Sequence, residues 1–279
     1  MNRMHRLAVI TAVALTLAAG VTSPAHAAAP SNDGFGNAEA ATGIGYTDSV
    51  NVSQATSGRR DPTNCANSAS VWYRYTPTAS QTINVNTNGS NYDTVIGVYT
   101  GGPGALTRVA CRDDGFTSRA ALDLEVQAGT TYYFMVGACC GKGRDGLEFQ
   151  RQPLLLQFRM TEPLSIEQLA AGGTGTVGRA DGEAQVTVSR QCTPAAEQSV
   201  VEASLRQRVG GTFVARSFSF RRAPCGTSSS DIALRFLPRG DIAFGEGPAT
   251  VSVRLTACSR ATGTCTRRSI TGEVVLAFR

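Results

Sequence analysis

Hydrophobic and polar positions alternate with a period of two along most of this chain, and helical periodicity is nearly absent. Short alternating runs bounded by Gly, Asn, Asp or Pro are typical of β-strands joined by turns. The predicted strands have the sequences SVWYRYT, QTINVNT, DTVIGVYT, LTRVACR, AALDLEV, TYYFMVG and LLLQFRM, followed by AQVTVS, VVEASLRQR, TFVARSFSF, IALRFL, ATVSVRLTA and ITGEVVLAF. Residues 165–171 are interpreted as one short turn or helix. The pattern therefore predicts an all-β protein of antiparallel sandwiches.

The alternation also separates the two faces of each strand. Val71 and Tyr73 share one face and Trp72 lies on the other, while Tyr133 lies opposite its neighbour Phe134. Either face could be the core. Trp72 and Tyr133 are thus our candidate exposed contacts for a ligand, and aromatic core packing is the alternative.

Composition changes near residue 163. All seven tyrosines and Trp72 precede this point. Residues 28–162 carry ten basic and twelve acidic side chains, a net charge of −2, whereas residues 163–279 carry fourteen and nine, a net charge of +5. We predict two sandwich domains of unlike surface: a jelly-roll-like one over residues 28–162 and an immunoglobulin-like one over residues 163–279.

Residues 1–27 have the pattern of a secretory signal peptide. Arg3 and Arg6 precede an apolar stretch, and the small residues Ala25 and Ala27 follow it. The apolar stretch is too short for an ordinary membrane span, and no second long apolar run follows. We therefore expect a secreted, extracellular protein without a membrane anchor.

All eight cysteines follow the predicted cleavage site, and an even number in an exported chain indicates disulfide bonds. The expected pairs in the second half are Cys192 with Cys225 and Cys258 with Cys265. The first half offers three pairings among its four cysteines, of which long-range ones are favoured because a bridge between adjacent residues is strained; these cysteines are Cys65, Cys111, Cys139 and Cys140.

The residue types needed for most catalytic mechanisms are scarce. Both histidines, His5 and His26, lie in the predicted signal peptide, and Lys142 is the single lysine. The commonest general base and the commonest neutral metal ligand are thereby missing from the mature chain. This composition favours a binding protein and not an enzyme, and we predict no catalytic residues.

A hydrolase that uses carboxylates alone is the alternative function. Its acids would come from Asp93, Asp113, Asp114, Asp123 and Glu125. Such an enzyme needs two carboxylates about 5 to 10 Å apart in a cleft. Adjacent Asp113 and Asp114 point to opposite faces of an extended chain and cannot form that pair together.

The first half resembles a known family in several ordered motifs. The segments SNDGFGNAEA, SVWYRYTP, NYDTVIGVYTGG, VACRDDG and AGTTYYFMVG, within residues 32–159, resemble the bacterial pre-peptidase C-terminal domain. That family comprises secreted β-sandwiches that accompany exported enzymes, among them the collagen-binding domains of clostridial collagenases. The resemblance implies a sandwich fold; it says little about the ligand, since sandwiches carry many functions. The second half resembles actinobacterial secreted sandwich domains of unknown function.

Calcium is the one cofactor that the resemblance implies. Asn32 and Asp33 match an Asn-Asp pair that calcium-binding members of the family use. The glutamates that precede the pair in those members are replaced here by residues 28–31, AAPS. A calcium ion takes six to eight oxygen ligands, several of them charged. A turn cap without metal is the alternative role of the pair.

The second half is rich in arginine, which could form a patch for an anionic wall polymer or an acidic partner. Arginines scattered for solubility are the alternative. The residues concerned are Arg206, Arg208, Arg216, Arg221, Arg222, Arg267 and Arg268. Nucleic acid is not expected as a partner, because no Tyr or Trp accompanies these arginines for base stacking.

The loop from Cys258 to Cys265 suggests a second alternative function. A disulfide-closed loop that presents Arg260 could inhibit a trypsin-like protease, since its ordering cost is removed before binding. A simple hairpin closure is the other interpretation. Taken together, the sequence predicts a secreted, non-catalytic binding module for extracellular matrix, cell-wall polymer or a partner protein.

Overall fold

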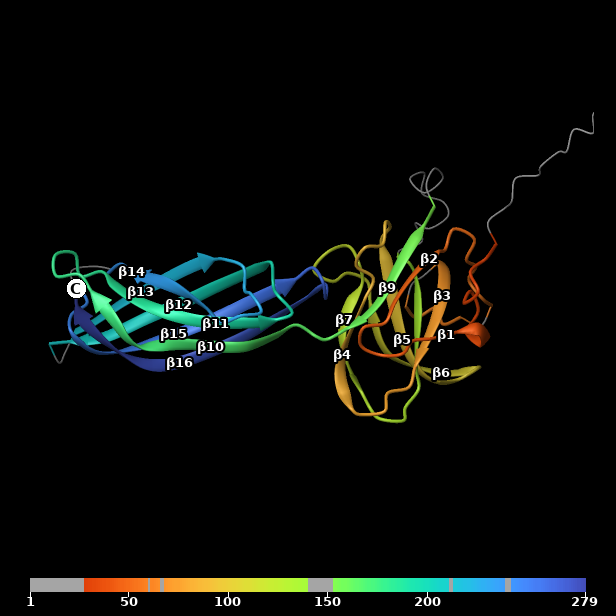
Figure 1. The fold of residues 1–279 in the computed structure, drawn as a ribbon, viewed down its shortest axis with the longest axis horizontal. Coiled ribbons are helices and arrows are strands. Elements are labelled where there is room, and N and C mark those ends of the chain that lie inside the picture. Colours follow the sequence, from red (N-terminus) through yellow and green to blue (C-terminus); the bar gives the residue numbers. More distant parts are fainter. Residues whose placement is uncertain (1–27, 60, 66–67, 140–152, 211–212, 239–241) are drawn as a thin grey trace, which may run out of the picture.

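The computed structural model describes residues 28–59, 61–65, 68–139, 153–210, 213–238 and 242–279, so the predicted signal peptide lies outside the described residues. Strands dominate these ranges, and the predicted all-β fold is confirmed (Figure 1). The first half contains the 3-10 helix η1 (Phe35–Asn37) and the strands β1 (Glu39–Ala40), β2 (Thr47–Asn51), β3 (Ser68–Tyr75), β4 (Gln81–Asn86), β5 (Thr94–Gly102), β6 (Ala105–Arg112), β7 (Ala121–Val126), β8 (Tyr132–Ala138) and β9 (Leu155–Thr161).

These strands form a two-sheet sandwich. One sheet has the order β1-β3-β8-β5-β6 and the other β2-β9-β4-β7, with every pairing antiparallel except β1 with β3. The two inner faces meet in an aromatic core. Its centre is Phe158 of β9, whose ring stacks on that of Tyr73 of β3 with the centroids 4.0 Å apart and the planes 6° apart. Tyr46 and Phe134 pack against Phe158 from two other directions.

The outer face of β3 is buried at Trp72 and exposed at Arg74, so the prediction of Trp72 as an exposed ligand contact is wrong. Its exposed fraction is 0%. The cause is the N-terminal segment, which covers the outer face of the sheet: β1 pairs with β3, and Phe35 of η1 packs edge-on against Trp72 with ring centroids 5.1 Å apart. Tyr133 also lies under Phe35, at 4.6 Å, and is half-buried.

The second half forms one continuous sheet of seven strands that closes into an immunoglobulin-like sandwich. It contains β10 (Ser165–Val177), β11 (Ala184–Thr193), β12 (Gln198–Val209), β13 (Phe213–Arg222), β14 (Ser230–Phe236), β15 (Gly247–Ser259) and β16 (Thr264–Phe278). Their order is β13-β12-β15-β16-β10-β11-β14. One layer holds β13, β12, β15 and β16, and the other holds β11 and β14; β10 pairs with β11 and then runs parallel to β16 at its end.

Residues 165–171 are therefore strand, and the predicted turn or helix is wrong. They pair with β11, with an irregularity between Ile166 and Gln168. The last strand of the first sandwich ends at Thr161 and β10 begins at Ser165, so the change from one sheet system to the other takes three residues.

Three disulfide bonds lie within the described residues. Cys192 with Cys225 and Cys258 with Cys265 are paired as predicted. In the first sandwich the bond joins Cys65 to Cys111, 46 residues apart. The two favoured pairings, in which Cys65 bonds to Cys139 or to Cys140, are therefore wrong. Cys139 is also disulfide-bonded, while Cys140 lies outside the described residues.

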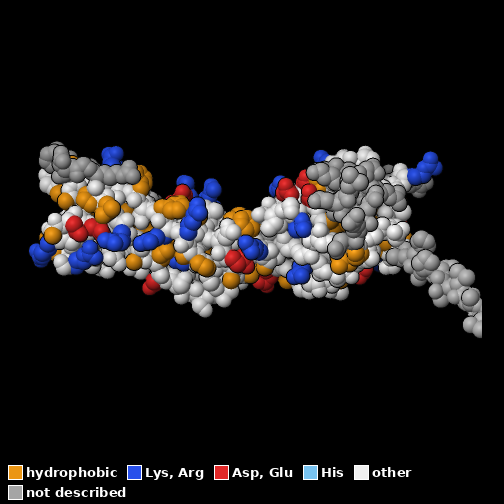
Figure 2. Space-filling model, turned by 90° about the horizontal axis from the view of Figure 1, so that it is seen from above, with side chains coloured by type: hydrophobic (Ala, Val, Ile, Leu, Met, Phe, Trp, Pro, Cys, Tyr) orange, Lys and Arg blue, Asp and Glu red, His pale blue; other side chains and the backbone are white. Residues whose placement is uncertain are grey.

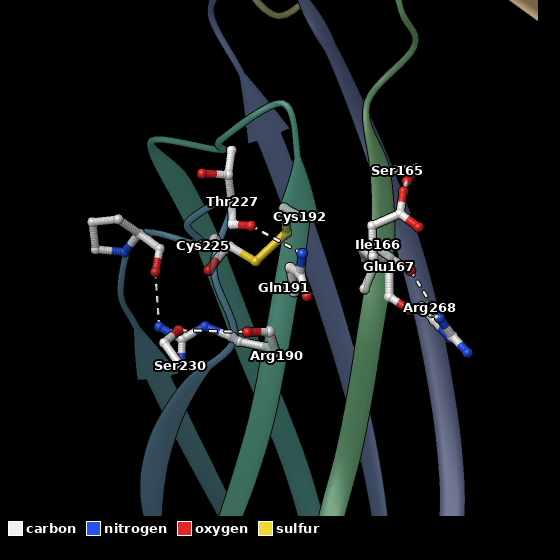
Figure 3. The surroundings of a disulfide bond; sticks show 12 residues. Ser165, Ile166, Glu167, Arg190, Gln191, Cys192, Cys225, Thr227, Ser230 and Arg268 are labelled. Carbon is white, nitrogen blue, oxygen red and sulfur yellow. Dashed lines mark hydrogen bonds between the residues drawn. A yellow bond between two sulfur atoms is a disulfide. The ribbon is translucent and has the colours of Figure 1, made fainter.

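The bond from Cys192 to Cys225 anchors the end of β11 to the segment before β14 (Figure 3). Hydrogen bonds surround it: the Arg190 guanidinium donates to the carbonyl oxygen of Pro224 at 2.7 Å, and the Gln191 amide donates to that of Thr227 at 2.9 Å. Since the described residues alone contain three disulfide bonds, the protein belongs in an oxidising, extracytoplasmic environment. None of the described helices has the length and apolarity to cross a membrane.

The two sandwiches lie end to end (Figure 1), and the tip of the β15–β16 hairpin contacts the first one. The Phe116 backbone N–H donates to the carbonyl oxygen of Gly263 at 2.5 Å, and the Asn88 side chain donates to that of Ala261 at 3.4 Å. Gly263 has a φ of +68°, and a Cβ there would lie 2.6 Å from that of Ala121. Only glycine fits both this backbone conformation and this close approach.

At the other end of the second sandwich, Glu183 joins three elements by ion pairs. Its carboxylate is buried and accepts two hydrogen bonds from Arg235 of β14, each 2.5 Å long. The Arg279 guanidinium, after β16, lies 3.5 Å away. The hydrogen bonds from Arg235 lower the pKa of Glu183 most, burial opposes them, and the positive charges of both arginines add to the lowering.

Replacing Glu183 by glutamine is expected to lower the thermal midpoint of unfolding at pH 7. Because the pKa of this carboxyl is lower in the folded state, its stabilising contribution is complete above the unfolded value, about 4.3, and is lost as the pH falls through the folded one. The difference in midpoint between the wild type and Glu183→Gln should therefore shrink towards about pH 2. Calorimetry over this range measures it. The matched control is Glu202→Gln, whose exposed carboxylate lies 3.8 Å from Arg254 and should matter little; a pH-independent difference for Glu183→Gln would contradict the assignment.

Candidate functional site

The outer face of the β13-β12-β15-β16 layer carries the most exposed aromatic side chains of the described residues. Phe218 and Phe220 of β13 are 66% and 54% exposed. They are two residues apart on one strand, so both rings stand on the same face. The neighbouring inward residues Ala215 and Ser217 are buried, so the alternation of β13 itself directs the phenylalanines to the solvent. Large exposed aromatic groups of this kind mark interaction sites.

An open groove of about 700 Å³ lies beside these rings. The register of the sheet brings its polar lining together, because Phe218 pairs with Ser204, which pairs with Ser252, which pairs with Thr271. The hydroxyls of Ser252 and Thr271 are 3.0 Å apart. The groove thus has phenyl rings along one side and a row of hydroxyl groups that crosses three strands.

Arginines frame the groove. We call the outward side chains of these four strands the aromatic–arginine face; its charged members are Arg206, Arg208, Arg216, Arg222, Arg254 and Arg267 with Glu202 and Glu273. Six positive and two negative groups leave a net charge of +4. Figure 2 shows basic and apolar side chains side by side along the half of the molecule that the second sandwich occupies.

The strand register divides the seven arginines that the sequence analysis singled out. Five of them, Arg206, Arg208, Arg216, Arg222 and Arg267, belong to the aromatic–arginine face. The other two lie at positions whose side chains alternate toward the inner face of the layer. Arg221 occupies such a position at the end of β13, and Arg268 donates to the carbonyl oxygens of Ile166 and Glu167.

The acids of the hydrolase alternative fall in three separate places. Asp93 and Asp113 approach each other, with carboxylate oxygens within 4.8 Å, next to the disulfide-bonded Cys139. Burial raises the pKa of Asp113, and the negative charges of Asp114 and Asp93 raise it further.

The remaining acids lie elsewhere. Asp114 and Asp123 line a hollow of about 540 Å³ that the hairpin tip of the second sandwich shares. Asp123 accepts a hydrogen bond from the Asn84 amide at 2.7 Å, and burial raises its pKa against the effect of that bond. Glu125 is exposed on β7. The five acids are therefore not gathered in one cleft.

Asn32 and Asp33 make hydrogen bonds within the protein. Both carboxylate oxygens of Asp33 accept hydrogen bonds from Thr56, at 2.5 Å from its N–H and 2.8 Å from its hydroxyl. The Asn32 amide donates to the carbonyl oxygen of Trp72 at 3.2 Å. Within the described ranges, the group of three ligand-type side chains that cluster within 4.8 Å includes neither residue. Asn32 thus fastens the N-terminal segment to β3 and Asp33 fastens it to the segment before that strand, while calcium binding by the pair stays a prediction.

The loop of the inhibitor alternative is not free. Thr262 and Gly263 are buried at the contact with the first sandwich. Arg260 keeps an exposed side chain, but its backbone N–H donates to the Glu197 carboxylate at 2.8 Å. Arg260 and the following Ala261 are exposed, whereas the next two residues of the loop are covered. The covered residues shorten the part of the loop that a protease could reach, and the inhibitor alternative stays a prediction.

Comparisons with known proteins do not assign this chain to a family. No protein-family model matches the chain, and no curated protein matches it. Solved structures to which the chain is similar include a β-glucuronidase from Parabacteroides merdae, with 10% identity, a TM-score of 0.26 and coverage of 75% of this chain and 28% of that one. Another is an exo-chitosanase from Amycolatopsis orientalis, with 12% identity, a TM-score of 0.23 and coverage of 79% and 28%.

The chain spans less than a third of the length of these two enzymes. Similarity at this level carries no argument about activity. The resemblance of the first half to the pre-peptidase C-terminal domain also stays a prediction.

Proposed function

We propose that this protein is an extracellular, non-catalytic binding module and that it engages its ligand through the aromatic–arginine face. The observation that carries the proposal is the pair Phe218 and Phe220, which are 66% and 54% exposed beside a polar groove. Exposing two phenyl rings on a regular strand forgoes about 1.5–3 kcal/mol of burial for each. Their place next to hydroxyl and guanidinium groups suits a ligand with both apolar and polar surface.

The exposed rings replace Trp72 as the ligand contacts that we assign. In this proposal the second sandwich binds the ligand and the first sandwich holds it in place. The first sandwich resembles domains that accompany exported enzymes. Matrix, wall polymer and partner protein were the predicted ligand classes, and this proposal commits to an insoluble matrix or wall polymer.

Retention on insoluble polymers tests the proposal. We expect the wild-type protein to be retained on at least one of collagen, chitin, cellulose and peptidoglycan, and Phe218→Ser with Phe220→Ser to reduce this retention at least about tenfold, as loss of aromatic anchors does. Leu237→Ser is the matched control, because Leu237 is equally exposed, at 62%, but follows β14 in the other layer. No retention of the wild type, or an equal loss for both variants, would refute the proposed function.

A further inference from the structure

Two arginines of the aromatic–arginine face lie directly opposite each other. The register of β12 and β13 pairs Arg206 with Arg216, and both side chains are exposed on the outer face. Like charges at opposed positions of neighbouring strands destabilise a sheet. Within the described ranges neither guanidinium has an ion-pair or hydrogen-bond partner. The pair is therefore an unfavourable arrangement for the protein alone, and an anion between the two guanidinium groups would relieve it.

The anion position adjoins the first phenyl ring. Arg216 and Phe218 are two residues apart on β13, about 7 Å at the rise of an extended strand. Beyond Phe220, Arg222 lies over that ring at 5.5 Å from its centroid. The row Arg216, Phe218, Phe220 and Arg222 thus places two aromatic rings between two positive charges over about 20 Å. This length and the open groove beside it suit a linear chain molecule and not a small compact ligand.

The hydroxyl groups beside the rings select among anionic chains. Ser204, Ser252 and Thr271 offer both hydrogen-bond donors and acceptors across the groove, as the hydroxyls of a sugar ring require. The faces of phenyl rings attract the partly positive C–H groups of a sugar. An acidic polypeptide would match the arginines, and its backbone could pair with the hydroxyls, but a chain such as polyglutamate has no ring to stack on Phe218 and Phe220.

From these observations we infer that the ligand of the aromatic–arginine face is a polysaccharide whose sugar rings themselves carry carboxylates. A ring carboxylate lies beside the sugar face that stacks on Phe218, which places it toward the Arg206–Arg216 pair. Arginine recognises a carboxylate through two parallel hydrogen bonds. In a polymer of phosphate diesters the negative charge lies in the linkage between units and not on the ring. A unit stacked on Phe218 would then not carry the charge that pairs with Arg206 and Arg216. This inference rests on the proposed function.

Binding of the full chain to soluble polygalacturonate tests the inference. We expect Arg206→Gln and Arg216→Gln each to raise the dissociation constant at least about tenfold, the effect of losing a charge-assisted hydrogen bond. Arg221→Gln is the matched control, since it removes the same charge from the same strand at a position outside the aromatic–arginine face. It should leave the dissociation constant within about threefold of the wild-type value. Unchanged thermal midpoints would show that the variants fold.

The competing ligands are part of the same experiment. Polyglutamate of equal charge and a neutral polysaccharide should each bind at least about tenfold more weakly than polygalacturonate, and phosphodiester polymer likewise. Equal binding of polyglutamate, an equal effect of Arg221→Gln, or no binding of polygalacturonate would overturn the inference. If retention on an insoluble polymer still depends on Phe218 and Phe220 in that case, the proposed function stands and only its ligand class is wrong.

Discussion

Replacing Phe158 by alanine is expected to lower the free energy of unfolding of the first sandwich by about 3–5 kcal/mol. The ring is fully buried between the two sheets and stacks on Tyr73, with Tyr46 and Phe134 around it. Its removal leaves a cavity that β-strands held by hydrogen bonds cannot close, so lost transfer energy and lost contacts add together. Urea unfolding followed by tyrosine and tryptophan fluorescence reports on this sandwich, since all such residues precede residue 163.

Phe218→Ala is the matched control for this experiment. The residue type and the change are identical, but this ring is 66% exposed. Its replacement should alter the free energy of unfolding by no more than about 0.5 kcal/mol. A small effect at Phe158, or a large one at Phe218, would mean that the core and the outer face have been wrongly assigned.

Removing the bond between Cys192 and Cys225 is expected to lower the free energy of unfolding of the second sandwich by about 2–4 kcal/mol. The bond closes a loop of 33 residues that contains β12 and β13. Without it, the unfolded chain gains the conformational freedom of that loop, while the folded state loses the link from β11 to the segment before β14. Calorimetry of Cys192→Ala with Cys225→Ala measures the change.

The bond between Cys258 and Cys265 provides a built-in comparison. It spans only 7 residues at the end of a hairpin whose strands already pair. Its removal should therefore cost less than removal of the longer closure. A larger loss of unfolding free energy on removal of the Cys258–Cys265 bond would contradict this. It would show that contacts around the shorter bond, and not the entropy of the unfolded chain, determine its contribution.

The alternation of hydrophobic and polar residues predicted the strands well wherever one face of a strand is buried and the other is exposed to solvent. β11 and β12 show this, because their residues alternate strictly between buried and accessible positions. Patterning failed at residues 165–171, where the pairing of β10 with β11 has a register shift between Ile166 and Gln168 and the alternation is interrupted. No local signal shows such a shift, because it depends on how β10 pairs with another strand.

Strand faces were harder to predict than strands. The sequence correctly separated Trp72 from Tyr73, but it could not show that η1 covers the outer face, since that packing joins residues far apart in sequence. For the same reason the sequence could indicate a patch of arginines but could not show which of them share one face. Only the pairing of β12 with β13 shows that Arg206 faces Arg216 while Arg221 belongs to the opposite side.

The hairpin tip that reaches the first sandwich gives the molecule two attachments between its halves, the covalent segment at residues 162–164 and the contact of Gly263 with Phe116. A single tether would let the halves swivel about each other, whereas two separated points resist twisting. The Cys258–Cys265 bond closes the tip that makes the second attachment. The orientation of one sandwich relative to the other is thereby restrained at two points.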